Sequence, residues 1–174
     1  MKKRVLITMA ASATLLLAGC GNDQKEDKNI TVSLPTGAKA DKLDAQGYDA
    51  AMPVYSAVYD ALVKYDKDKG VKAGLAEKWH VDESGKVYEF HLKKNVKFSD
   101  GSALDAKAVK FSIERAKAMN KDTTVETLKK LDKVVVKSDH VVQIRLKSPS
   151  NQVLNELTQV RPLRIMSCLL YTSD

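Results

Sequence analysis

Residues 59–109 alternate short apolar runs with clusters of turn-forming residues, and this alternation constrains the fold more than any other feature. The run Val87–Leu92 is rich in β-formers and lies between the polar clusters Glu83–Gly85 and Lys93–Asn95. A short apolar run bounded in this way is typical of a strand. The segment therefore predicts small strands joined by tight turns, with a helix after them.

The expected helix follows a second turn signal. Val96–Phe98 alternates apolar and polar residues until the turn residues Ser99–Gly101 interrupt it. Gly101 supplies the backbone freedom that a tight turn needs. Asp105 is a suitable N-cap for a helix that runs toward Met119. Its apolar side would carry Val109, Ile113 and Ala116.

Further elements are expected on both sides of this segment. We expect a helix from about Met52 and a single helical turn at residues 75–79, with Trp79 packed inward. Trp79 and Phe98 are interpreted as core residues and not as ligand contacts. The remaining patterns predict strands at 30–34 and 62–65, short helices at 125–131 and 151–157, and a β-hairpin formed by 133–138 and 140–147.

The positive charge of the chain does not indicate nucleic-acid binding. The formal net charge is +7, but Lys2, Lys3 and Arg4 supply three of these charges, and later lysines are interspersed with acids. Aromatic residues make up only 6% of the chain and form no platform for bases. Two cysteines, Cys20 and Cys168, give neither a disulfide framework nor a paired zinc motif.

The first 29 residues have the features of an export and anchoring sequence. A basic start precedes an apolar run at residues 5–17, which is too short for a comfortable transmembrane helix. Leu17-Ala18-Gly19-Cys20 resembles the bacterial lipobox, which implies a diacylglyceryl group on Cys20, and two acyl chains are enough for stable anchoring. We expect a signal peptide over 1–19 and a polar tether over 20–29. The mature protein would be held at the outer face of the cytoplasmic membrane, as in Gram-positive bacteria.

Four motifs occur in order at close spacing, and as a set they resemble one protein family. They are Tyr59-Asp60-Ala61-Leu62-Val63, Leu75-Ala76-Glu77-Lys78-Trp79, Tyr88-Glu89-Phe90-His91-Leu92 and Val96-Lys97-Phe98-Ser99-Asp100-Gly101. The set resembles the family 5 extracellular solute-binding proteins of ABC importers, which take up oligopeptides, dipeptides, nickel and metallophore complexes. The resemblance implies an α/β fold of the type II periplasmic-binding-protein kind, with a mixed sheet and short helices. Residues 30–167 would be part of its N-terminal lobe.

The same resemblance implies a binding protein and not an enzyme. It implies a monomer whose partners are an ABC permease, its ATPase and a small-molecule or peptide ligand. Residues 156–164 most resemble the nickel and metallophore branch, in which a similar Glu-Leu … Arg-Pro segment places its arginine in the cleft. This makes Arg161 a candidate ligand contact, since a guanidinium binds a carboxylate through two parallel hydrogen bonds. Pro162 is expected to keep Arg161 extended. Met52 and Tyr48 are further candidates from this resemblance. The alternatives are a structural role for Arg161 and a core position for Met52.

The nature of the ligand stays open between a metal chelate and a peptide. Residues 120–125 lack the Arg, His and Trp that a member of the nickel branch carries in this loop, which argues against nickel itself. His80, His91 and His140 are spread over separate predicted strands and do not suggest a direct metal site. We expect no resident cofactor, a transported metal chelate as the favoured ligand, and an oligopeptide or dipeptide as the alternative.

A secreted enzyme is the alternative from another functional class. No Gly-x-Ser-x-Gly, His-Glu-x-x-His or phosphate-binding glycine loop occurs in the sequence. Asp100 or Glu89 beside His91 offers an acid and a base, but we expect strand alternation to send neighbouring side chains to opposite faces.

Residues 168–174 (Cys-Leu-Leu-Tyr-Thr-Ser-Asp) resemble one reading frame of a transposase adapter used in sequencing libraries. We expect the coding sequence to be interrupted at about Ser167, so that Cys168 is neither a redox thiol nor a nucleophile. A genuine apolar C-terminal tail is the alternative.

Overall fold

The computed structural model describes residues 43–47 and 52–169. These residues all belong to one compact unit, residues 34–174. The expected signal peptide, tether and strand at 30–34 lie outside the described residues, as do Cys20, Tyr48 and residues 170–174. Within the described ranges, no helix combines the length and the apolar character that crossing a bilayer requires.

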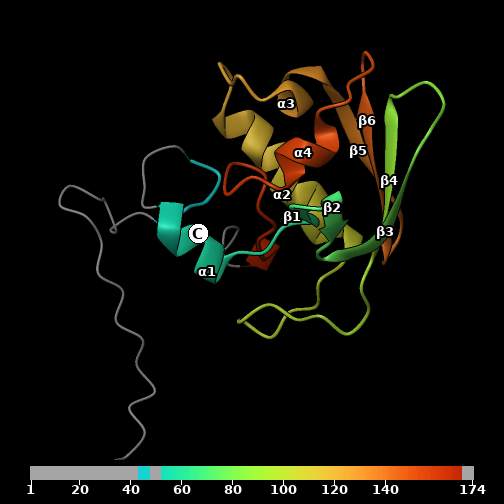
Figure 1. The fold of residues 1–174 in the computed structure, drawn as a ribbon. Helices are drawn as coiled ribbons and strands as arrows, with labels where there is room; N and C mark the ends of the chain where they lie inside the picture. The colour runs from blue at the N-terminus through green and yellow to red at the C-terminus, as the bar shows by residue number, and fades with distance from the viewer. Residues whose placement is uncertain (1–42, 48–51, 170–174) are drawn as a thin grey trace, which may run out of the picture. The chain divides into compact units, whose positions relative to one another are not determined.

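A four-stranded antiparallel sheet organises the described residues, and short helices lie along one side of it (Figure 1). The strands follow the order β3-β4-β6-β5, and β1 and β2 form a separate hairpin. The mixed α/β class with short helices is therefore confirmed. The elements are α1 (Met52–Val58), β1 (Val63–Asp66), β2 (Gly70–Ala73), β3 (Ala76–Val81), β4 (Val87–Leu92), α2 (Ala106–Met119), α3 (Glu126–Lys130), β5 (Leu131–Ser138), β6 (Val141–Leu146) and α4 (Val153–Leu157).

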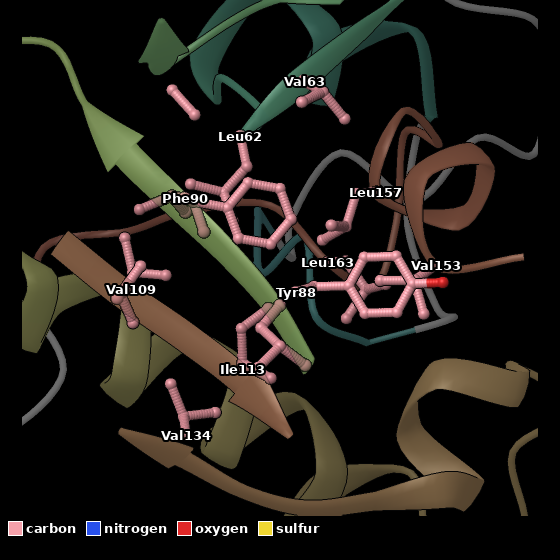
Figure 2. Close-up of a cluster of buried hydrophobic side chains, with 14 of the residues drawn as sticks. Leu62, Val63, Tyr88, Phe90, Val109, Ile113, Val134, Val153, Leu157 and Leu163 are labelled. Carbon is pink, nitrogen blue, oxygen red and sulfur yellow. The ribbon is translucent and has the colours of Figure 1, made fainter. Parts of the chain in front are cut away.

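The apolar face of the sheet follows from the period-two pattern of its central strands. In β4 and β6 every second residue is buried, because successive side chains of a strand point to opposite faces. Figure 2 shows Tyr88 and Phe90 of β4 directed into the same cluster as Leu62, Leu157 and Leu163. The cluster joins strands, helices and the C-terminal segment into one core. The hairpin expected at 133–147 is confirmed as β5 and β6.

Helix α2 begins and ends where the sequence predicts. The Asp105 carboxylate accepts a hydrogen bond from the backbone N–H of Ala108 at 2.8 Å, which satisfies one of the free donors of the first turn. At the other end, the Asn120 side chain donates to the Ala116 carbonyl at 2.7 Å. The predicted core residues Val109, Ile113 and Ala116 are all buried.

The helical turn expected at residues 75–79 is wrong, because this segment forms the start of β3. Trp79 lies opposite Phe90 in the antiparallel pairing of β3 with β4, and a register shift occurs between Ala76 and Lys78. The β4 residues that pair with residues 76–79 lie more than ten positions further along the chain, so the local sequence does not reveal this strand. Trp79 is half-buried and packs against the core, as does Phe98.

The β1–β2 hairpin depends on two glycines with different roles. Gly70 has φ +73°, a conformation that residues with a Cβ rarely adopt, and it ends the charged turn after Asp66. Gly74 lies against the backbone, where an added Cβ would stand 2.5 Å from the Ala61 carbonyl oxygen. The close approach of Gly74 to Ala61 holds the hairpin near the residues that follow α1.

The C-terminal segment returns to the beginning of the described fold. Ile165 forms an isolated antiparallel bridge with Asp60, and its N–H donates to the Asp60 carbonyl at 3.1 Å. Met166 and Ser167 are buried. The Ser167 hydroxyl donates to the Asp100 carboxylate, which also accepts from the Ser102 hydroxyl at 2.6 Å. Asp100 of the Ser99–Gly101 turn therefore holds the last buried residues in place.

Candidate functional site

A pocket of about 480 Å³ lies where the end of α1, the beginning of β1 and the segment after α4 meet. Its lining is polar, with hydroxyl groups and three charged side chains. The lining residues are Ser56, Ala57, Val58, Tyr59, Asp60, Lys64, Tyr65, Thr158 and Arg164. A concave site with several converging polar groups is the usual setting for a small ligand.

Arg164 is the unusual member of this lining because it is a buried cation. The residue is only 8% exposed, and its Nε donates to the Val160 carbonyl at 3.1 Å. Burial lowers the pKa of the Arg164 guanidinium below its usual value, and the negative charge of Asp60 acts in the opposite direction. No sequence motif described above singles out this residue. The pair of arginines around Pro162–Leu163 was the available signal.

Asp60 and Lys64 form an ion pair in the same pocket. The Lys64 Nζ lies 3.0 Å from Asp60 Oδ1, and both side chains are substantially exposed. The same Oδ1 accepts the backbone N–H of Ala61 at 2.8 Å. The Asp60 carboxylate is thus engaged by its own neighbours along the chain.

A second pocket of about 310 Å³ is mainly apolar. It lies between the loop that includes Phe98, the residues after α1 and the segment Ile165–Ser167. Leu75, Val96 and Leu104 contribute to its lining. Its surface offers few groups that could orient a polar ligand.

The structure places the predicted contacts Arg161 and Met52 outside the linings of these two pockets. Arg161 is half-buried in a bend at residues 159–162, and its peptide bond to Pro162 is cis. The expected extended backbone at Arg161 stays a prediction. Met52 is the first residue of α1 and is 45% exposed, so the alternative of a core position does not apply. Tyr48 and Cys20 lie outside the described residues.

Glu156 of the Glu-Leu … Arg-Pro segment has a structural role. Its carboxylate accepts the backbone N–H groups of Glu126 and Thr127, each at 2.7 Å, and the Thr127 hydroxyl at 2.6 Å. The N-cap residue of α3 is Val125, which has no side chain able to cap the helix. Glu156 supplies the missing acceptor from a distant part of the chain.

The expectation that strand alternation separates the Glu89 and His91 side chains is wrong. They are two residues apart in β4 and therefore share a face, and Glu89 Oε1 lies 3.1 Å from His91 Nε2. The Gln143 side chain donates to Glu89 Oε2 at 2.7 Å. This hydrogen bond is the main cause that lowers the pKa of Glu89, with the His91 charge acting in the same direction. Neither Glu89 nor His91 lines either of the two pockets described above.

No group of three or more His, Cys, Asp or Glu side chains within the described ranges has the arrangement of a metal site. The polar pocket around Arg164 is instead suited to hydrogen bonds and charge pairing with an anion.

Comparison with known proteins places this fold in the class of periplasmic-binding-protein-like structures. The structure of NikA from Brucella suis in complex with Fe(III)-EDTA superposes with a TM-score of 0.67 at 30% identity, over 72% of this chain and 26% of that one. The nickel-binding periplasmic protein of Escherichia coli is 32% identical over 168 residues, which are 95% of this chain and 30% of that protein. The glutathione-binding protein GsiB of Pectobacterium atrosepticum is 31% identical over 154 residues, covering 80% of this chain and 30% of its own length.

Residues 70–165 match the family described as bacterial extracellular solute-binding proteins, family 5. The chain therefore belongs to this family, as its ordered motifs predict. It spans about a third of the length of the curated relatives it matches.

Proposed function

We propose that this chain is the N-terminal part of a lipid-anchored, extracytoplasmic substrate-binding component of an ABC importer. Membership of family 5 is the observation that carries this proposal. Residues 30–167 would supply part of the first lobe, and the ligand would be enclosed by closure against a second lobe. The protein would act as a monomer, deliver its ligand to a permease driven by an ATPase, and release that ligand chemically unchanged.

We propose a metal chelate, of nickel or another metal bound to a metallophore, as the cargo. The similarity to a nickel-binding protein over 95% of the chain favours this choice. Arg161 would bind a carboxylate of the chelate, with Met52 and Tyr48 nearby in the cleft. A guanidinium offers paired donors that match the two oxygens of a carboxylate.

A short peptide is the second candidate, and the similarity to a glutathione-binding protein favours it. In that case Arg161 would bind a carboxylate of the peptide. Peptide receptors that accept many sequences hold the ligand mainly by its backbone. The two candidates therefore differ in whether the metal contributes to affinity.

The membrane anchor is proposed at Cys20. Radiolabelled palmitate fed to cells that express the chain should enter the wild-type protein and not Cys20→Ala. Equal labelling of both proteins would contradict the proposal. Resequencing the locus by a library method without the adapter tests the proposed interruption at Ser167, and an uninterrupted tail ending at Asp174 would overturn it.

Calorimetry on the protein encoded by the uninterrupted reading frame tests the cargo. The ligands are Ni²⁺, Ni²⁺ with histidine, Ni²⁺ with EDTA, EDTA alone and glutathione. We expect a nickel chelate to bind at least tenfold more tightly than glutathione, and Arg161→Ala to weaken its binding by at least tenfold. Arg145→Ala on the sheet is the matched control and should change nothing. Binding of glutathione alone would refute the metal cargo, and full chelate affinity in Arg161→Ala would refute the site.

A further inference from the structure

We propose that the pocket around Arg164 is a binding site for a carboxylate of a small organic acid, with Arg164 as its anchor. The residue is 92% removed from solvent, yet it lines a pocket large enough for a ligand. Lysine and arginine side chains are almost never fully buried without a charge partner, because desolvation of the charged group is costly. The site is separate from Arg161.

Among the described residues, Arg164 forms no close ion pair, although the negative charge of Asp60 acts on its guanidinium. Its Nε donates to the Val160 carbonyl, and no protein acceptor in the described part of the chain receives a hydrogen bond from its two Nη groups. The nearby carboxylate is that of Asp60, whose ion pair is with Lys64. Two Nη groups in a planar fork therefore remain for a ligand.

The charge and shape of the pocket select the class of ligand. Lys64 and Arg164 contribute two positive charges and Asp60 one negative charge, so the lining carries a single net positive charge. This balance suits one carboxylate better than a densely charged group such as phosphate. Two parallel hydrogen bonds from a guanidinium match the two oxygens of a carboxylate, and the Tyr65 and Thr158 hydroxyls can bind polar groups of the remaining molecule.

A carboxylate could also come from an Asp or Glu of the longer polypeptide, and we assign the site to a free acid. Lys64 and Asp60 both line the pocket, and their side chains are substantially exposed in this chain. The experiment below separates the two sources.

The test is an NMR titration of the 174-residue chain with succinate, and with succinamide as the uncharged analogue. We expect succinate to shift the Arg164 Nε–H resonance, and succinamide to bind at least tenfold more weakly. Arg164→Gln should weaken succinate binding at least tenfold, read from the backbone amides of Leu163 and Ile165. Arg145→Gln is the matched control, since its guanidinium lies on the sheet and donates to Gln143. Equal binding of succinate and succinamide overturns the proposal.

A second variant decides the outcome if Arg164→Gln does not fold. Asp60→Asn keeps the Oδ1 that accepts the Ala61 N–H but removes the negative charge from the pocket. We expect succinate to bind this variant several-fold more tightly, and unchanged or weaker binding overturns the proposal. The last arm uses the protein from the uninterrupted reading frame. If it fails to bind succinate while the 174-residue chain binds it, the site belongs to a side chain of the same protein and a free acid is excluded.

Discussion

The carboxylate of Glu156, at the end of α4, caps the first turn of α3 by accepting both the backbone N–H and the hydroxyl of Thr127. Two short helices that could not form stable structure alone are thereby joined through one side chain. A residue that the family resemblance associates with the ligand segment thus acts on the scaffold, and its neighbour in that segment, Arg161, can be tested separately.

Replacement of this capping carboxylate should destabilise the fold. We expect Glu156→Ala to lower the free energy of unfolding by about 1–2 kcal/mol, since lost helix caps cost this much. The measurement is urea unfolding followed by circular dichroism. Asn155→Ala is the matched control on the same short helix, and its exposed side chain should matter by less than about 0.5 kcal/mol. Identical midpoints for the two variants would contradict the capping role.

The ion pair between Asp44 and Arg115 should make stability depend on acidic pH. Burial raises the pKa of Asp44, but the Arg115 hydrogen bond, the Gln46 N–H and the Arg115 charge together outweigh it, so the pKa lies below its usual 3.8. A depressed carboxyl pKa stabilises the fold above the unfolded value, and this contribution is lost as pH falls through the folded value.

We therefore expect Asp44→Asn to cost about 1–2 kcal/mol at pH 7 and progressively less below pH 4. Urea unfolding of the wild-type chain and the variant at several pH values measures the difference. The variant retains the Oδ1 acceptor but replaces Oδ2, which accepts from Arg115 Nη2 at 2.6 Å, with an amide donor, so the charge is identified by the pH dependence of the cost. A cost that is constant between pH 7 and pH 3 would show that the charge is not responsible.

Gly74 should tolerate no side chain. An added Cβ would meet the Ala61 and Leu62 carbonyl oxygens at 2.5 and 2.8 Å, and backbone atoms cannot move aside cheaply. We expect Gly74→Ala to cost about 3 kcal/mol, at the upper end for overpacking by one methyl group. Gly47→Ala, whose Cβ would make an ordinary 3.6 Å contact, is the control. Thermal unfolding of both variants tests the prediction, and similar melting temperatures would be inconsistent with the close contact.

The Asp100 carboxylate should hold the C-terminal segment in place. It accepts hydrogen bonds from the Ser102 N–H, the Ser102 hydroxyl and the Ser167 hydroxyl. We expect Asp100→Ala to speed amide hydrogen exchange in residues 165–169 by about tenfold, because local opening no longer breaks these bonds. Asp82→Ala, which removes a comparable turn carboxylate at the β3–β4 connection, should leave this segment unchanged. Unaltered exchange in Asp100→Ala would show that other contacts hold the segment.

Elements with strong local signals could be predicted from the sequence. Asp105 and the spacing of Val109, Ile113 and Ala116 define α2 because the cap and the apolar stripe are both properties of one short segment. Strand β3 could not be predicted in this way, since its conformation depends on pairing with β4. Strand alternation separates adjacent residues, but Glu89 and His91 are two apart and therefore share a face of β4.

The candidate site was less accessible to sequence reasoning than the fold. The family resemblance indicates Arg161, which lies in a bend and is not part of the lining of the polar pocket. Arg164 was missed, because the burial of a cation depends on chain segments about 100 residues apart, which meet at Asp60 and Ile165. An arginine in an apolar stretch indicates a binding site only once the pocket beside it is known.

The bridge between Asp60 and Ile165 has a consequence for biosynthesis. Residue 60 leaves the ribosome long before its partner, and at usual rates of synthesis the delay is roughly 5–20 s. During that time the buried residues Leu62 and Val63 have no completed core against which to pack. A chain with this topology stays open for threading until Ile165 is made, and that delay is an advantage to any polypeptide that must cross a membrane before it folds.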